Sequence, residues 1–426
     1  MSLLGEIERT HTVTSDEGVL RLVAAGSVDD GKSTLIGRLL HDCQAILEDQ
    51  LAAVARASSR RGEGNLDLSL LTDGLEAERE QGITIDVAYR YFATPRRKFI
   101  LADAPGHEQY TRNMVTGAST ADVAVILIDA RKGVLTQTRR HTYIAHLLGL
   151  RHLFVAVNKM DLVGYARERF AAIREDFLRF AAPMAIADLR FFPISALRGD
   201  MVVERGGAMP WYDGPTLLEA LENAPVQHEA DALPLRLQVQ TVLRGNGGDF
   251  RGYGGRIASG VLRPGDEVAV LPVGRRTTVR EIVGFEGPRE AAFAAESVTV
   301  RLADDIDLAR GDLLADPAQP PRVGNSLEAT LCWLDHEPLR IEARYLLKHG
   351  TRTVPARIAA LQHAVDVQTL ARKIPEQPLT MNEIGQATLS LQQAVAVDPY
   401  SANRETGSFI LIDPVSNRTV AAGMVI

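Results

Sequence analysis

Residues 26–33 read Gly26-Ser27-Val28-Asp29-Asp30-Gly31-Lys32-Ser33 and match the phosphate-binding pattern G-x-x-x-x-G-K-[ST]. The apolar run 20–25 precedes this stretch and has the length and composition of a buried strand. The segment 33–40 follows it with apolar residues at helical spacing. A strand, a glycine-rich loop and a helix in this order are the context in which such a loop binds phosphates. The stretch therefore predicts an α/β fold that holds a nucleoside triphosphate.

The chemistry of this loop follows from its residue types. Glycines let the backbone curl, so that successive N–H groups point at phosphate oxygens, and the helix that follows adds the positive end of its dipole. We expect Lys32 to reach the β- and γ-phosphates and the Ser33 hydroxyl to bind Mg²⁺. The predicted phosphate-loop contacts are Gly26, Ser27, Val28, Asp29, Asp30, Gly31, Lys32, Ser33 and Thr34.

The composition of the chain is that of a soluble globular protein with several domains. Its 426 residues are 46% hydrophobic and 24% charged, and this length exceeds one ordinary core. A net charge of −7 gives no sign of a general nucleic-acid-binding surface. Cys43 and Cys332 lie far apart, so no disulfide scaffold or C-x-x-C metal pair can form.

The sequence lacks the patterns of a signal peptide and of a membrane span. Residues 1–9 lack the apolar core of a signal peptide, and the apolar run 123–128 is far shorter than the ~18 residues of a membrane span. We therefore expect a cytoplasmic protein with neither a membrane nor a nucleic-acid partner.

Strand-like apolar runs alternate with helical patterns up to about residue 225. The runs lie at 99–102, 123–128, 153–157 and 191–194 after the first strand, and amphipathic stretches at 138–150 and 167–181 lie between them. This alternation predicts a parallel sheet covered by helices.

The pattern changes after Pro225 to short β-rich runs separated by Gly, Pro and Asp, with a second break near residues 320–324. Such runs predict small antiparallel barrels. The predicted organisation is an α/β P-loop domain followed by two all-β barrels. Its boundaries are 1–225 for the first domain, 230–323 for the second and 325–426 for the third.

The segment Asn158-Lys159-Met160-Asp161 follows the expected strand at 153–157 and has the chemistry of a guanine site. The Asp161 carboxylate can accept hydrogen bonds from guanine N1–H and from the 2-amino group, whereas adenine offers no such pair of donors. We expect Asn158 to contact N7 and to tie this segment to the phosphate loop, and the stem of Lys159 to cover the base. Ser195-Ala196-Leu197, after the strand at 191–194, fits a backbone donor to guanine O6, chiefly Ala196.

The segment Asp103-Ala104-Pro105-Gly106-His107 follows the expected strand at 99–102. An Asp at a strand end can hold Mg²⁺ through a water, and a glycine N–H can contact a γ-phosphate. His107 is placed to orient the attacking water as the catalytic residue, a role that Gln fills in other GTPases of this type. Asp-x-x-Gly is also common in ordinary turns, and its position about seventy residues past the phosphate loop favours the functional interpretation.

Thr84 lies between these segments, within Glu80-Gln81-Gly82-Ile83-Thr84-Ile85. Its hydroxyl is expected to complete the Mg²⁺ shell, in a loop that orders only while the γ-phosphate is present. A threonine in a loop is ordinarily a surface residue, and its position between two site motifs is what favours a ligand. The predicted metal ligands are Ser33, Thr84 and Asp103.

All five guanine-nucleotide segments occur in order, and on these residues the chain resembles the translational-type GTPases. Within that group it is most similar to the GTPase (large) subunits of bacterial ATP sulfurylases. The resemblance spans nearly the whole chain and loosens at about residues 325–402. The segments that carry it are 73–92, His107-Glu108-Gln109-Tyr110-Thr111-Arg112-Asn113-Met114, Met209-Pro210-Trp211-Tyr212, Asp249-Phe250-Arg251-Gly252-Tyr253 and 407–413.

This resemblance implies a division of labour between two subunits. A separate small catalytic subunit transfers AMP from ATP to sulfate, and GTP hydrolysis on the large subunit drives that uphill reaction. The sequence agrees, because it has one G-K-[ST] loop, no S-G-G-x-D-S loop and no H-x-G-H pair. The resemblance thus implies GTP and Mg²⁺ as cofactors, and the small subunit as the partner in a hetero-oligomer such as a heterodimer.

The same resemblance gives roles to two apolar residues. Val28 and Ile83 match the pair that flanks the catalytic histidine in the family, which implies that they restrain His107. Elongation factors commonly carry His where this chain has Asp30 and Thr where it has Ser33. Ser33 still supplies the hydroxyl that Mg²⁺ binding needs.

The alternative function is that of a translation elongation factor that delivers aminoacyl-tRNA. A run of basic residues would then contact RNA phosphates, although such a run is more often a solvated helix face or a partner surface. The residues are Arg131, Lys132, Arg139, Arg140 and His141.

Overall fold

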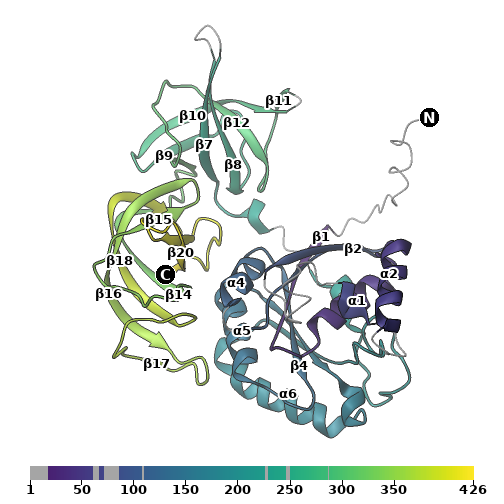
Figure 1. Ribbon diagram of the computed structural model, residues 1–426. Helices are drawn as coiled ribbons and strands as arrows, with labels where there is room; N and C mark the ends of the chain where they lie inside the picture. The colour runs from purple at the N-terminus through teal and green to yellow at the C-terminus, as the bar shows by residue number, and fades with distance from the viewer. Residues whose placement is uncertain are drawn as a thin grey trace, which may run out of the picture. The chain divides into compact units, whose positions relative to one another are not determined.

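The stretch that is predicted to bind phosphates follows an interior strand of a six-stranded sheet with the strand order β2-β3-β1-β4-β5-β6. Strands β1, β2 and β4 of this sheet are labelled in Figure 1. The computed structural model describes residues 18–60, 67–71, 86–107, 110–225, 229–245, 250–285 and 287–426. Strands β1, β3, β4, β5 and β6 pair in parallel, as the sequence predicts. The strands of this sheet are β1 (Val19–Gly26), β2 (Ala88–Ala93), β3 (Lys98–Asp103), β4 (Val123–Asp129), β5 (His152–Asn158) and β6 (Asp188–Pro193).

Strand β2 departs from the parallel arrangement that the alternating pattern predicts. It pairs antiparallel with β3 at the edge of the sheet, with Ala93 opposite Lys98. The two strands are joined by a tight turn in which the N–H of Thr94 donates to the carbonyl of Arg97 at 2.9 Å. A connection this short can join only antiparallel neighbours, because parallel strands need a crossover of a dozen or more residues.

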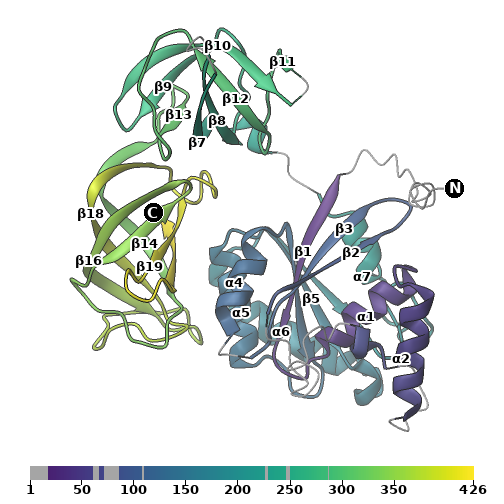
Figure 2. The ribbon, with the colours of Figure 1, turned by 45° about the horizontal axis from the view of Figure 1, so that its top comes forward.

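Helices cover both faces of this sheet. Figure 2 shows α1 and α7 on one side and α4 and α5 on the other. Helix α1 buries Leu35, Ile36, Leu39 and Leu40, whose helical spacing forms one apolar stripe. The helices are α1 (Lys32–Asp42), α2 (Glu48–Arg60), α4 (Thr111–Ser119), α5 (Thr136–Leu147), α6 (Arg167–Ala181) and α7 (Leu217–Glu222).

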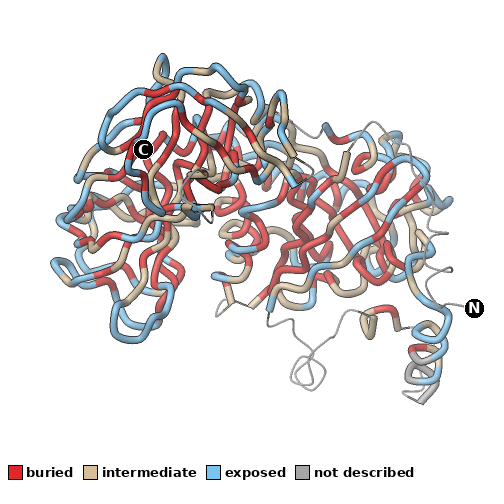
Figure 3. Tube along the Cα trace, turned by 90° about the horizontal axis from the view of Figure 1, so that it is seen from above, coloured by how far each residue is buried: buried red, intermediate tan, exposed pale blue. Residues whose placement is uncertain are grey.

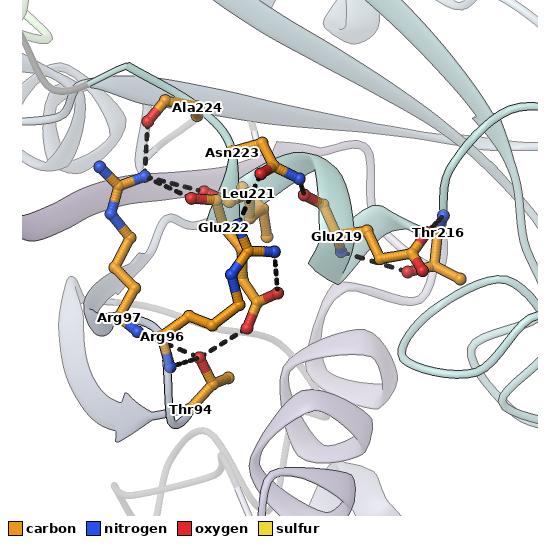
Figure 4. A network of polar contacts seen from close by, with 9 residues as sticks. All are labelled: Thr94, Arg96, Arg97, Thr216, Glu219, Leu221, Glu222, Asn223 and Ala224. Carbon is orange, nitrogen blue, oxygen red and sulfur yellow. Dashed lines mark hydrogen bonds and ion pairs between the residues drawn. The ribbon is translucent and has the colours of Figure 1, made fainter. Parts of the chain in front are cut away.

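A polar network fastens the turn between β2 and β3 to the end of α7 (Figure 4). The buried Arg97 guanidinium donates to the carbonyls of Leu221, Glu222 and Ala224 at 3.2, 3.0 and 2.5 Å. Thr94 donates to the Glu222 carboxylate at 2.6 Å. A cation at a helix C-terminus satisfies carbonyls that have no partner within the helix. The last helix of this unit is thereby fixed to the hairpin that ends at Asp103.

His141 on α5 is fully buried, although it belongs to the basic run for which the sequence predicts a surface role. Neither of its ring nitrogens has a hydrogen-bond partner among the residues that the structure describes. Burial, together with the nearby cations Lys32 and Arg140, lowers the pKa of His141 to about 3. The solvated face of the basic run therefore does not include His141.

We expect this histidine to make α5 sensitive to acid. The folded-state pKa of about 3 lies below the usual value of 6.5, so acidification below pH 6.5 protonates His141 only in the unfolded chain. The free energy of opening around α5 should therefore be about 2 kcal/mol lower at pH 5 than at pH 7. Amide hydrogen exchange of α5 in wild type and His141→Leu at both pH values measures this difference. An equal loss in the variant would contradict the assignment.

The chain divides into two compact units, the first with the six-stranded sheet and the second with residues 227–366 and 370–426. This second unit consists of two antiparallel barrels, as predicted. In the first, β9 pairs with both β13 and β10, which closes six strands and leaves β11 attached at one side. Its strands are β7 (Arg236–Arg244), β8 (Arg251–Ser259), β9 (Glu267–Leu271), β10 (Arg275–Gly284), β11 (Gly287–Arg289), β12 (Ser297–Leu302) and β13 (Leu313–Ala315).

The second barrel closes in the same way, because β15 pairs with both β19 and β16. Buried residues follow the strands of both barrels, red in Figure 3. The buried Arg236 and Asp398 form an ion pair at 2.9 Å that joins the two barrels. The strands are β14 (Arg322–Trp333), β15 (Tyr345–His349), β16 (Arg352–Val365), β17 (Arg372–Lys373), β18 (Ile384–Val397), β19 (Ser408–Ile412) and β20 (Thr419–Val425).

Candidate functional site

The predicted site segments of the first unit follow the carboxyl ends of neighbouring parallel strands. The phosphate loop follows β1, residues 103–107 begin at the end of β3, residues 158–161 at the end of β5, and residues 195–197 come just after β6. Because these strands are parallel, their carboxyl ends meet at one edge of the sheet, where open α/β sheets place their ligands.

The backbone of the phosphate loop has the curvature that an anion site requires. Gly31 has φ +93°, and a Cβ at this position would come within 2.4 Å of the Asn158 side-chain nitrogen, so only glycine fits. Helix α1 begins directly afterwards, and its N-cap residue, Gly31, has no side chain that could cap the first turn. The N–H groups of that turn therefore point outward with the positive end of the helix dipole.

The side chain of Lys32 contacts the backbone of this loop. Its ammonium group donates to the carbonyls of Gly26 and Ser27 at 3.2 and 3.4 Å. Burial lowers the pKa of Lys32, and the charges of Asp103, Asp30 and Asp29 oppose that shift. A Cβ on Gly106 would come within 2.5 Å of the ammonium nitrogen, so the segment after β3 passes directly over it. The arrangement suits an ammonium group that neutralises phosphate charge.

Asp30 acts within the loop. Its carboxylate accepts a hydrogen bond from the N–H of Ser27 at 2.7 Å, and the residue is only 1% exposed. Burial raises the pKa of Asp30 to about 6, against the Ser27 hydrogen bond and the charge of Lys32. At the position where elongation factors commonly carry His, this side chain therefore braces the loop from inside.

The segments predicted to bind the base are joined to each other and to the phosphate loop. The buried Asn158 side chain donates to the carbonyl of Asp30 at 2.8 Å and accepts the N–H of Ala196 at 2.9 Å. The Ser195 hydroxyl donates to the Asp161 carboxylate at 2.7 Å. The structure thus contains the contact between Asn158 and the phosphate loop that the sequence predicts. A contact from Ala196 N–H to guanine O6 would be shared with Asn158.

Arg38 is a site residue that the motifs do not name. From α1 it donates to the carbonyls of Ala196 and Leu197 at 3.1 and 2.7 Å, while an ion pair with Asp42 orients it. It thereby fixes the loop that presents the Ala196 N–H. The local sequence carries no signal for this role, because the partner loop lies 158 residues away.

His107 lies four residues before the start of α4 and is partly buried. Its carbonyl accepts the N–H of Tyr110 at 3.0 Å, and the two rings are 6.0 Å apart. Val28 is also partly buried, whereas Thr84 and Ile83 lie outside the described residues. The predicted roles of these residues stay predictions.

The donors predicted for Mg²⁺ have the right chemistry. Ser33 lies in the first turn of α1, and Asp103 is a buried residue that ends β3. Hydroxyl and carboxylate oxygens are the hard ligands that Mg²⁺ prefers. Within the described part of the chain, no three His, Cys, Asp or Glu residues form a separate metal site.

The basic residues of the alternative function differ in their contacts and in their exposure. Arg131 forms an ion pair with Asp129 at 2.6 Å, and the Arg139 guanidinium lies over the ring of Phe180 at 5.0 Å. His141 is buried. Arg131 and Lys132 are exposed, whereas Arg139 and Arg140 are half-buried. None of the described helices could cross a bilayer.

Two family models match the two ends of the chain. The model of the Elongation factor Tu GTP binding domain matches residues 17–226, and that of the GTP-eEF1A C-terminal domain-like family matches residues 326–426. Among solved structures, sup35 complexed with GMPPNP is similar at 24% identity, with a TM-score of 0.44 over 99% of this chain and 97% of that chain.

Relatives with curated names match nearly the whole chain. The sulfate adenylyltransferase subunit 1 of Chromobacterium violaceum is 53% identical over 100% of this chain and 89% of its own length. That of Shewanella oneidensis is 53% identical over 96% and 86%. The bifunctional enzyme CysN/CysC of Mycobacterium tuberculosis is 54% identical over 96% of this chain and 67% of its own length.

Proposed function

This chain belongs to the sulfate adenylyltransferase subunit 1 family, and we propose that it is the subunit that hydrolyses GTP to drive sulfate activation by a partner. The observation that carries the proposal is the joined base site, in which Ser195 holds Asp161 at 2.7 Å and Asn158 links that site to the phosphate loop. The translation-factor alternative is not favoured, because the relatives of similar length are named as sulfate adenylyltransferase subunits.

Guanine selectivity rests on Asp161. Its carboxylate accepts N1–H and the 2-amino group of guanine, and Ser195 fixes its orientation from the other side. Adenine would leave this carboxylate without a matching pair of donors, and sites built for polar pairing reject such ligands strongly. Lys159 covers one face of the base, and the exposed side chain of Leu197 is available for the other.

Hydrolysis needs a water held in line with the γ-phosphate. We assign that role to His107, which follows Gly106 at the point where the chain passes over Lys32. Lys32 supplies positive charge to the β- and γ-phosphates. The remaining proposed contacts are the phosphate loop 26–34, residues 103–106, Met160 and Ala196.

Mg²⁺ neutralises developing phosphate charge when it is bound. We propose that Ser33 and Asp103 hold it, with Thr84 as the third ligand from this chain. The hydroxyl of Ser33 would bind directly, and the carboxylate of Asp103 would act through a water.

The coupled reaction belongs to a small catalytic subunit in a hetero-oligomer. There a sulfate oxygen attacks the α-phosphorus of ATP, a P–O–S anhydride forms, and the bond to pyrophosphate breaks. The products are adenosine 5′-phosphosulfate and pyrophosphate. This step is uphill, so it needs a second, favourable reaction, and GTP hydrolysis supplies one if the two nucleotide states contact the partner differently. We place this assembly in the cytoplasm and divide the chain at 1–225, 230–323 and 325–426.

Affinity capture distinguishes this proposal from the elongation-factor alternative. The tagged full-length chain, loaded with a non-hydrolysable GTP analogue, is presented with the small sulfurylase subunit of the same cell and, separately, with aminoacyl-tRNA. We expect retention of the subunit and not of the tRNA, with the GDP-loaded chain as the control. Retention of the tRNA alone would overturn the proposal.

A further inference from the structure

Asp129 occupies a central position at the nucleotide-binding edge, although no motif includes it. It is the last residue of β4, which lies between β1 and β5 in the sheet. Its register partner on β5 is Asn158. The phosphate loop therefore follows the strand on one side of it, and the base-binding segment follows the strand on the other.

The Asp129 carboxylate is completely buried yet holds two cations. One oxygen accepts the Arg131 backbone N–H at 2.9 Å and its Nε at 3.0 Å. The other accepts Arg131 Nη2 at 2.6 Å and lies 3.2 Å from Lys159 Nζ, with the Asp129 side chain 0% exposed. Burial alone would raise the pKa of Asp129, but the hydrogen bonds from Arg131 and Lys159 hold it well below its usual range. The carboxylate is therefore charged throughout the physiological range.

Lys159 connects this carboxylate to the phosphate loop. Its ammonium group also donates to the backbone carbonyl of Asp29. Its own backbone is in the left-handed region, with φ +64°. A lysine ordinarily loses considerable side-chain entropy when its ammonium group is fixed, so a fixed lysine needs strong partners. Here the partners are the buried Asp129 carboxylate and the Asp29 carbonyl of the phosphate loop.

We propose that Asp129 is a positioning residue for nucleotide binding. It anchors the Lys159 ammonium against the phosphate loop, so that the methylene stem of the lysine lies over the base. The inference rests on the proposed guanine-nucleotide site. Because the contact lies on the base side, it affects GTP and GDP equally and leaves the hydrolytic step unchanged.

A purely structural role would act through the turn between β4 and α5. The backbone N–H groups of Lys132 and Gly133 donate to the Asp129 carbonyl at 3.0 and 2.9 Å, and Arg131 covers the carboxylate. If bracing this turn were the only function of the carboxylate, loss of Arg131 would have the same effect as loss of Asp129. Arg131→Gln is therefore the matched control.

The test is the affinity of the full chain for fluorescent GTP and GDP, with the GDP dissociation rate. Asp129→Asn should raise both dissociation constants about tenfold, the size expected for one charge-assisted hydrogen bond, while single-turnover hydrolysis of bound GTP stays unchanged. Arg131→Gln should change affinity less than threefold. On a Lys159→Met background, Asp129→Asn should have no further effect, because the two residues act as one unit.

Several outcomes would overturn the inference. These are additive effects of Asp129→Asn and Lys159→Met, an Arg131→Gln effect as large as that of Asp129→Asn, or affinity that Asp129→Asn leaves unchanged. If Asp129→Asn does not fold, Asp129→Glu enters the same cycle, because it keeps the charge and moves the carboxylate. A wild-type chain that binds neither nucleotide would instead refute the proposed function itself.

Discussion

Replacing Asp161 by Asn is expected to change the preferred nucleotide from GTP to xanthosine triphosphate. In the proposed site the carboxylate of Asp161 accepts two hydrogen bonds from guanine, and an amide could not accept both because its NH₂ is a donor. Xanthine carries a carbonyl where guanine carries the 2-amino group, so the same amide pairs with it. Charge-assisted paired contacts discriminate strongly, and we expect GTP affinity to fall about 100-fold or more.

The measurement is competition of GTP, xanthosine triphosphate and ATP against a fluorescent guanine nucleotide. Glu175→Gln on the exposed face of α6 is the control, because its side chain is 76% exposed and forms an ion pair with Arg179 on the same helix. An unchanged preference for GTP in Asp161→Asn would refute the guanine assignment, even though Ser195 still contacts residue 161.

Replacing His107 by Ala should abolish GTP hydrolysis without abolishing GTP binding. His107 is expected to orient the attacking water, whereas binding energy comes from the phosphate loop and the base segment. Loss of a group that positions or activates the nucleophile ordinarily costs 10²- to 10⁴-fold, and we expect kcat to fall about 100-fold or more. The dissociation constant for a non-hydrolysable analogue should change less than about threefold.

The His107→Ala variant also tests whether GTP hydrolysis drives sulfate activation. In the complex with the small subunit, GTP turnover and sulfate activation should fall together in His107→Ala. His336→Ala, an exposed histidine in the second unit, is the control. Sulfate activation at the wild-type level beside a hundredfold loss of hydrolysis would show that the two reactions are not coupled through this residue.

The buried strands and their connecting helices could be predicted from the sequence, because their periodicity is local. The amphipathic stretch 167–181 coincides with α6 (Arg167–Ala181), and the apolar run 123–128 lies within β4. The edge strand β2 was missed, since Tyr89 and Tyr91 are exposed and only Phe92 is buried. Strand β20 was missed because it consists largely of small residues, with Gly423 packed under the ring of Phe409.

One of the β-rich runs after residue 324, at 339–347, predicts a longer strand than the second barrel contains. The run 339–347 is apolar at both ends, but the strand β15 begins only at Tyr345. Glu342 has φ +63°, which no extended strand allows, and the N–H of Leu339 donates to the carbonyl of Leu379 outside any strand. Turn geometry therefore overrides the apolar pattern there.

The residues of the candidate site also differ in whether the local sequence predicts them. Residues within contiguous motifs, such as Lys32 and Asn158, could be found because their spacing is local. Arg38 and Asp129 could not, because each acts on a segment from another part of the chain: Arg38 reaches Leu197 across 159 residues. Asp129 did carry a signal, namely a charged residue that ends an all-buried strand, and such a residue needs compensating partners.

The most direct test of the account measures both reactions in one sample. The chain is combined with the small subunit, ATP, sulfate and Mg²⁺, and phosphate released from GTP is followed beside adenosine 5′-phosphosulfate. We expect adenosine 5′-phosphosulfate to accumulate far beyond its GTP-free equilibrium level only while GTP is hydrolysed. In Asp161→Asn, we expect the same accumulation to depend on xanthosine triphosphate instead of GTP. Accumulation to the same level without any hydrolysable nucleotide would contradict it.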